Sequence, residues 1–66
     1  MKYMIAGNYQ NYLDTLHDYN ENPKNWKYIS QPKQLYGIHG TKIYYGHNSY
    51  LSPAWEMAER INKEVV

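Results

Sequence analysis

The sequence predicts a small α/β domain: a three-stranded parallel sheet in the order 2-1-3, with two main helices and one short helical turn. The first observation behind this prediction is that short apolar runs alternate with segments of helical periodicity. The second is that Gly, Pro or Asn stands at most boundaries between them. Strands that alternate with helices are typical of βαβ units, whose right-handed crossovers place the first strand in the centre of the sheet. With 66 residues and no internal repeat, the chain is expected to form a single domain, residues 1–66.

The chain begins with a predicted strand and helix. Residues 2–6 (KYMIA) form a short apolar run, and the Gly7-Asn8 step ends it. Asn8 is a favourable N-cap because its side-chain oxygen can accept a hydrogen bond from a free N–H group of the first helical turn. A helix is therefore predicted over 9–20, and its helically spaced inner face consists of Tyr9, Tyr12, Leu13, Leu16 and Tyr19.

Three shorter elements follow in the middle of the chain. Pro23 disfavours helix at the residue before it and separates the first helix from a second strand over 26–29 (WKYI). One or two helical turns are predicted within 30–37 (SQPKQLYG), because Pro32 suits a first turn and the segment ends in Gly. The run TKIYY predicts a third strand over 41–45, with a Gly on each side.

The last element is a predicted helix over 53–64. Ser52 and Pro53 have the pattern of a helix start, with Ser as the N-cap and Pro in the first helical position. The preceding residues 47–51 (HNSYL) are predicted to form a loop. Charged pairs four residues apart support the exposed face of this helix. Its inward stripe is predicted to be Ala54, Ala58, Ile61 and Val65.

Tyrosine is the most unusual feature of the composition. The chain has nine Tyr and two Trp but no Phe, so every aromatic ring carries a polar group that needs water or a hydrogen-bond partner. Adjacent residues of a strand point to opposite faces, which predicts opposite faces for Tyr44 and Tyr45 and a shared face for Trp26 and Tyr28. The surplus of Tyr and Trp predicts an exposed aromatic surface, because both residues are enriched at protein–protein hot spots.

Composition and charge disfavour several functional classes. The chain has no Cys, and its three His fit no zinc-binding pattern, so neither a metal nor another cofactor is expected. A net charge of +1 disfavours nucleic acid as the partner, because proteins that bind nucleic acids use strongly basic surfaces. The sequence shows no signal-peptide pattern and no apolar run long enough to cross a membrane, which predicts a soluble cytoplasmic protein.

Several short motifs are similar to those of small uncharacterised phage proteins. They are the strand–Gly-Asn–helix start MIAGNYQNYLDTL, the run WKYIS, and a Leu-x-Gly-x-x-Gly element formed by Leu35, Gly37 and Gly40. The resemblance spans most of the chain and implies a fold and a phage setting, in the cytoplasm of a host cell. Small phage proteins often bind and inhibit a host replication, transcription or defence protein, so the resemblance implies a host protein as the partner.

The Gly7-Asn8 turn is the first candidate site. In a parallel sheet, ligands bind beyond the carboxyl ends of the strands where the strand order reverses, which here is the end of the central first strand. The N-terminus of the following helix points there and favours anions. The alternative is a plain strand-to-helix cap, since the sequence has no glycine-rich phosphate motif and no Lys or Arg beside the turn. The residues expected to contact a ligand there are Gly7, Asn8, Tyr9 and Ser30, with His47, Asn48 and Ser49 after the third strand.

The function that the sequence favours is non-catalytic binding of a host macromolecule, which the chain would inhibit or redirect through its aromatic surface. Catalysis by His47 is not expected, because a Ser/His/acid arrangement needs an acid that the sequence does not place beside it. The sheet has two open edges, so a homo-oligomer is also expected. The alternative function is a module that binds or sequesters a nucleotide or signalling nucleotide at the N-terminus of the first helix. The expected contacts of the macromolecule are Tyr9, Tyr45, His47, Asn48 and Tyr50.

Overall fold

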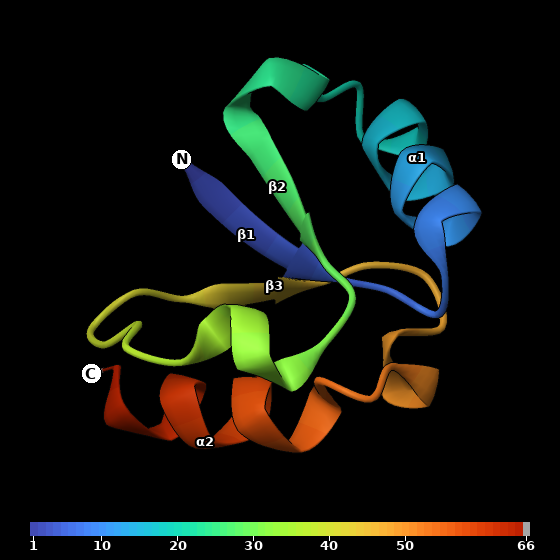
Figure 1. Cartoon of the computed structure of the whole chain (residues 1–66). Helices are drawn as coiled ribbons and strands as arrows, with labels where there is room; N and C mark the ends of the chain where they lie inside the picture. Colours follow the sequence, from blue (N-terminus) through green and yellow to red (C-terminus); the bar gives the residue numbers. More distant parts are fainter. Residues whose placement is uncertain (66) are drawn as a thin grey trace.

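The computed structural model describes residues 1–65 and confirms the predicted α/β class. Its sheet has three parallel strands, β1 (Lys2–Ile5), β2 (Trp26–Ile29) and β3 (Ile43–Tyr45), in the order β2-β1-β3 (Figure 1). The first strand is therefore central, as the right-handed crossover rule predicts. Strand β2 has the predicted bounds, whereas β1 and β3 cover only 2–5 and 43–45 of the predicted 2–6 and 41–45.

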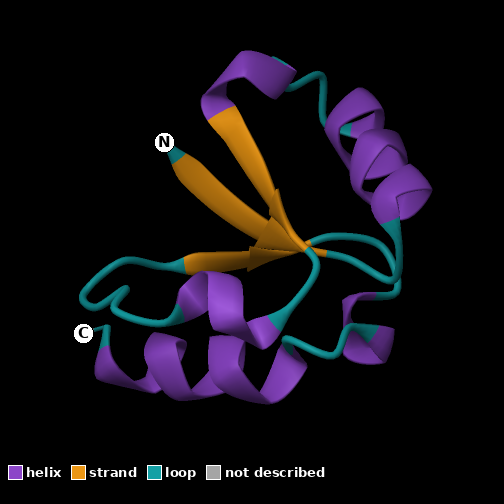
Figure 2. Cartoon of the chain, in the orientation of Figure 1, coloured by secondary structure: helices purple, strands orange, loops and turns teal. Residues whose placement is uncertain are grey.

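Two helices pack on opposite faces of this sheet. They are α1 (Tyr9–Asp18) and α2 (Trp55–Glu64), and Figure 2 shows them on opposite sides of the strands. Neither of these ten-residue helices, nor any other helix within residues 1–65, has the length and apolar character that a membrane span requires. Three short 3₁₀ turns join the elements: η1 (Pro23–Asn25), η2 (Pro32–Leu35) and η3 (Ser49–Leu51).

The α2 face of the sheet is a closed aliphatic core. Each strand contributes one Ile that is fully buried, and the small Ala residues of α2 allow the helix to approach these side chains closely. Burying one such Ile or Leu side chain stabilises the fold by about 1.5–3 kcal/mol. The buried members of this core are Ile5, Ile29, Leu35, Ile43, Ala54, Ala58 and Ile61.

The α1 face is built from larger side chains. Tyr12 and Leu16 of α1 reach the sheet at Met4 and Trp26, and Ala6 completes this buried cluster. The rings of Tyr12 and Tyr28 lie 5.1 Å apart and hold the first half of the helix over β2. Trp26, Tyr28 and Tyr44 all belong to this face, whereas Tyr45 stacks on Trp55 of α2 with ring centroids 5.0 Å apart. The predicted division of the aromatic residues between the two faces is therefore confirmed.

Helix α1 ends two residues earlier than predicted. Asn20 adopts the left-handed conformation, with φ of 54°, and the N–H of Glu21 donates to the carbonyl of Leu16 at 2.8 Å. This is the arrangement by which a left-handed residue, usually Gly or Asn, satisfies the last carbonyls of a helix. The predicted inner face was also wrong at its two ends, because Tyr9 and Tyr19 are 58% and 70% exposed.

Helix α2 begins later than the Ser-Pro pattern indicates. Its N-cap is Ala54 rather than Ser52, and the Ser52 hydroxyl instead accepts from the N–H of Ala54 at 3.1 Å. The predicted loop over 47–51 contains η3 (Ser49–Leu51). Because Ser52 is the C-cap of η3, it does not serve as the N-cap of α2, and the helix starts later. Val65 lies beyond the helix and is 36% exposed, so it does not extend the buried stripe.

Gly46 allows α1 to approach the end of β3. A Cβ atom at this position would lie 2.9 Å from the sulfur of Met4 and 2.9 Å from the hydroxyl of Thr15, too close for any real side chain. The N–H of Gly46 donates to the carbonyl of Ile5 at 2.8 Å and continues the pairing of β1 with β3. The glycine is therefore required by close packing and not by its backbone conformation.

Asn62 of α2 covers the outer edge of β3. Its carboxamide accepts from the N–H of Ile43 at 2.8 Å and donates to the carbonyl of the same residue at 2.9 Å, as a neighbouring strand would. The same amide donates to the hydroxyl of Tyr45 at 2.9 Å, and that hydroxyl donates to Glu59 at 3.1 Å. Burial raises the pKa of Tyr45 above 10.0, and Glu59 raises it further against the opposing hydrogen bond from Asn62.

Replacing Gly46 with Ala is expected to destabilise the fold. The added methyl must displace either the Met4 or the Thr15 side chain from a packed position, which typically costs about 1–3 kcal/mol. Denaturant unfolding followed by circular dichroism measures the difference. An unfolding midpoint equal to that of the wild type would show that the end of β3 is not pressed against α1.

The raised pKa of Tyr45 predicts a loss of stability at alkaline pH. Because the phenol ionises less readily in the fold than in the unfolded chain, its contribution is complete below pH 10.0 and is lost as the pH rises through the folded pKa. Tyr45→Phe should remove part of the late tyrosinate absorbance change, to which Tyr12 with its raised pKa also contributes, and make the alkaline decline of the unfolding midpoint shallower. If the absorbance of the Tyr45→Phe variant were lower by the same fraction at every pH, Tyr45 would titrate like the other tyrosines, and this assignment would be contradicted.

Candidate functional site

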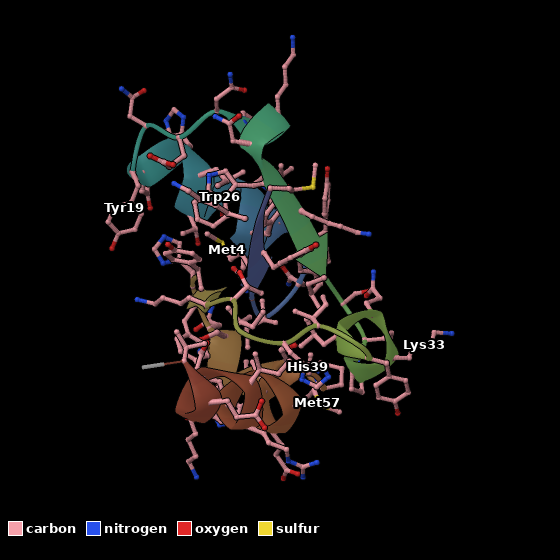
Figure 3. The ribbon with its side chains drawn as sticks, turned by 90° about the vertical axis from the view of Figure 1, so that its left-hand side faces the viewer. Met4, Tyr19, Trp26, Lys33, His39 and Met57 are labelled. Atoms are coloured by element: carbon pink, nitrogen blue, oxygen red, sulfur yellow. The ribbon has the colours of Figure 1, made fainter. Side chains whose placement is uncertain are left out.

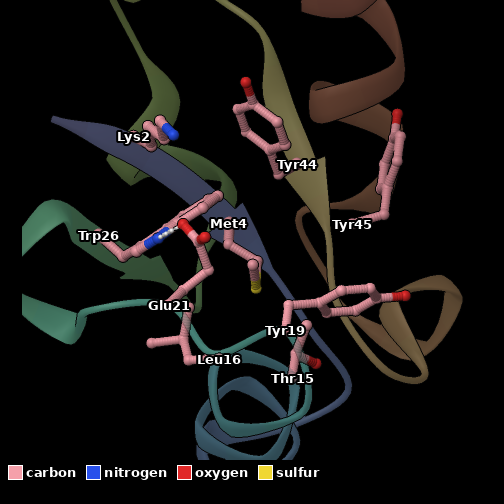
Figure 4. Close-up of a pocket in the computed structure, with 9 residues that line it drawn as sticks. All are labelled: Lys2, Met4, Thr15, Leu16, Tyr19, Glu21, Trp26, Tyr44 and Tyr45. Atoms are coloured by element: carbon pink, nitrogen blue, oxygen red, sulfur yellow. Dashed lines mark hydrogen bonds between the residues drawn. The ribbon is translucent and has the colours of Figure 1, made fainter.

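One hollow of the described chain lies on the α1 face of the sheet. Helix α1 packs over β1 and β2 through its large side chains and leaves a groove of about 410 Å³ between its C-terminal half and β3 (Figure 4). We call this hollow the aromatic groove. Its lining residues are Lys2, Met4, Thr15, Leu16, Tyr19, Glu21, Trp26, Tyr44 and Tyr45.

The floor of the aromatic groove is apolar and its walls are aromatic. Met4 of β1 and Leu16 of α1 are both buried, and Trp26 of β2 lies beside them with 8% of its surface exposed. The ring of Tyr44 meets the indole edge-on, with centroids 5.0 Å apart and an interplanar angle of 81°. Tyr19 stands at the end of α1 and is 70% exposed (Figure 3). The groove therefore has an exposed tyrosine and a tightly held tryptophan in its lining.

Polar side chains fix the two rings of the groove. The indole N–H of Trp26 donates to the carboxylate of Glu21 at 3.0 Å, which orients the ring. The ammonium group of Lys2 lies 5.3 Å from the centre of the Trp26 ring, and that of Lys42 lies 5.1 Å from the centre of the Tyr44 ring. Both distances are within the range of cation–π attraction. The groove thus combines apolar surface with the positive charge of Lys2 in its lining and that of Lys42 at its border.

Backbone and side-chain contacts engage several groups of the predicted site at the Gly7-Asn8 turn. The side chain of Asn8 caps α1 and accepts from the N–H of Asn11 at 2.8 Å. The N–H of Gly7 donates to the carbonyl of His47 at 3.0 Å, so it is not free for an anion. A Cβ on Gly7 would lie 2.8 Å from that of Asn48, which shows how closely the two loops pack. The strand-to-helix cap describes this turn better than the anion site.

His47 connects the loop after β3 to α1. Its backbone N–H donates to the hydroxyl of Thr15 at 2.8 Å, and its Nε2 atom lies 2.7 Å from a carboxylate oxygen of Asp18. The structure therefore supplies the acid that the sequence could not place. Ser49, in contrast, is 7% exposed, and within residues 1–65 no hydrogen bond joins its hydroxyl to His47. The contact between His47 and Asp18 therefore joins the loop after β3 to α1, and Ser49 does not complete a nucleophilic triad with them.

The other four predicted contact residues lie apart from one another. Tyr9 packs on Tyr28 with ring centroids 5.6 Å apart, and the hydroxyl of Ser30 donates to Gln34 at the start of η2. Tyr50 is 66% exposed on η3. Tyr45 borders the groove, but its ring lies against α2 (Figure 4). Of the predicted residues, the structure brings together Gly7, Asn8, His47 and Asn48 at the turn.

Sequence reasoning did not identify the aromatic groove as a site. A signal was present, because Lys2 and Met4 are two residues apart on β1, as are Lys42, which precedes β3, and Tyr44 on β3, and residues at this spacing share a face of the sheet. What the sequence lacked was the position of α1 over that face. Without the position of α1, the sequence could not distinguish the exposed side chains of this face from those that the helix covers.

No metal centre accompanies the groove, since residues 1–65 contain no cluster of three or more His, Asp and Glu side chains that could hold an ion. Comparison of the chain with protein-family models, with curated proteins and with solved structures finds no match in any of the three.

Proposed function

We propose that this chain is a non-catalytic binding protein that holds a partner protein in the aromatic groove and thereby inhibits or redirects it. The observation that carries the proposal is the half-covered sheet face, where Trp26, Tyr44 and Tyr19 line a groove with an apolar floor. Concave apolar surfaces with a few convergent polar groups are the usual form of binding sites. Trp and Tyr residues in such surfaces carry a large share of protein–protein binding energy.

The setting that we propose is the cytoplasm of a cell infected by a phage. Support for it comes from the resemblance to small phage proteins, which rests on the Gly7-Asn8 start and on the Leu35, Gly37 and Gly40 element. The partner would then be a host protein of defence, replication or transcription. The nucleotide alternative has less support, because the Gly7 N–H and the Asn8 side chain already have partners within the chain.

Replacing Tyr19 with Ala is expected to weaken partner binding without unfolding the protein. The side chain is 70% exposed, so its removal leaves the core intact, whereas a hot-spot tyrosine is worth about 2 kcal/mol or roughly thirtyfold in Kd. The partner is first isolated from host lysate by affinity capture, and its Kd for each purified variant is then measured by calorimetry.

Tyr36→Ala is the matched control for this experiment. Tyr36 is 68% exposed but follows η2 on the α2 side of the sheet, so its removal should leave the Kd unchanged. A partner that binds Tyr19→Ala as tightly as the wild type, or that loses affinity only for Tyr36→Ala, would remove the groove from this proposal.

We also propose that the chain self-associates, and that β2 rather than β3 provides the shared edge. The carboxamide of Asn62 already occupies the outer edge of β3 at Ile43, which leaves β2 as the more accessible edge. Sedimentation velocity over a range of concentrations should show a dimer. A monomer at every concentration would exclude self-association of the free protein.

A further inference from the structure

Two lysines stand beside the rings of the aromatic groove. Lys2 is one of the nine lining residues, whereas Lys42 borders the groove, because its ammonium group lies over the ring of Tyr44. Glu21 is the acidic residue among the nine. Within residues 1–65, no carboxylate oxygen lies within 4.0 Å of either lysine ammonium group. The carboxylate of Glu21 instead accepts the indole N–H of Trp26. Two ammonium groups are therefore held at the groove by aromatic rings and have no ion-pair partner there.

The two lysines lie at the same end of the groove. Lys2 begins β1, and Lys42 immediately precedes β3. The residues that follow them, Tyr3 and Ile43, are register partners in the parallel pair, so both lysines lie at the amino ends of adjacent strands. A single acidic side chain placed there could pair with both, while an apolar neighbour occupies the floor at Met4.

The lysines also disfavour stacking of a nucleic-acid base in the groove. Proteins that bind single strands offer an open ring face to each base. Here Trp26 is only 8% exposed, and the ammonium groups of Lys2 and Lys42 lie over the rings of Trp26 and Tyr44. The positive charge of the groove is thus available to an anion, whereas the ring faces themselves are largely occupied.

We propose that the occupant of the aromatic groove is an acidic segment of the partner protein. It places one apolar side chain on the floor formed by Met4 and Leu16, and a neighbouring Asp or Glu carboxylate between Lys2 and Lys42. This inference rests on the proposed function, because it names the chemistry of the segment that the groove holds. The carboxylate enters on the β3 side, away from the Glu21 carboxylate on the α1 side.

Selection from a library of short random peptides tests this inference before the partner has been identified. Full-length wild-type protein is the bait, and the probe for site occupancy is the indole N–H signal of Trp26 in a nitrogen-15 NMR spectrum. The chain has two Trp, so a Trp55→Phe variant assigns the two signals. We expect the enriched peptides to combine an aliphatic or aromatic residue with an adjacent Asp or Glu, and to shift the Trp26 signal.

Charge removal gives the second arm of the experiment. The double variant Lys2→Gln and Lys42→Gln should bind the selected peptides about tenfold more weakly at low salt, as expected for the loss of two exposed ion pairs of usual strength. The matched control is Lys27→Gln and Lys33→Gln, which removes two exposed lysines outside the groove and should leave the affinity unchanged. Raising the salt concentration should reduce the difference.

Several outcomes would overturn the inference. The selection could enrich no peptide at all, or only basic or uncharged peptides. The selected peptides could bind the double variant as tightly as the wild type. A single-stranded oligothymidylate could shift the Trp26 indole signal more than the selected peptides do. Basic or uncharged peptides that shift the Trp26 signal would reject the acidic segment but leave the groove as a binding site. Loss of the groove itself would be shown by the captured partner binding Tyr19→Ala normally, so the two failures are distinguishable.

Discussion

The contact of Thr15 with the loop after β3 fixes the position of α1, and the candidate site depends on that position. The Thr15 hydroxyl donates to the Asn11 carbonyl at 2.7 Å and accepts the N–H of His47 at 2.8 Å, so it links the helix to the end of the sheet. Gly46 provides the space for this approach, and Asp18 adds a contact to the His47 ring. With α1 held at this point, the helix covers β1 and β2, and the Tyr44 side of the same face stays open.

The two faces of the sheet form their cores from different kinds of side chain. On the α2 face, Ala54 and Ala58 bring the helix close enough for aliphatic side chains to exclude water. On the α1 face, the larger side chains of Tyr12 and Trp26 fill the space between helix and sheet, and the indole N–H of Trp26 donates to Glu21. The absence of Phe follows from this arrangement, because each ring at the margin of this core needs a polar group that reaches water or a hydrogen-bond partner.

Local sequence patterns predicted the elements of this fold better than its site. The alternation of Tyr44 and Tyr45 assigned each ring to its correct face because strand geometry alone decides that direction. The end of α1 and the start of α2 were displaced because Asn20 takes a left-handed conformation and η3 occupies the residues before Ser52. The aromatic groove could not be predicted, since it results from a contact between residues 32 positions apart.

A half-covered aromatic face would promote aggregation in a free protein unless something shields it. Lys2 and Lys42 provide that shield, because their aliphatic stems and ammonium groups lie over the rings and keep charge at the surface of the groove. The same lysines gain a stronger partner when a carboxylate arrives, since charge-assisted hydrogen bonds exceed the attraction of an exposed ammonium group for a ring. Shielding of the free groove and the proposed selectivity for an acidic segment then have one physical origin, the two cations that lie over the rings of Trp26 and Tyr44.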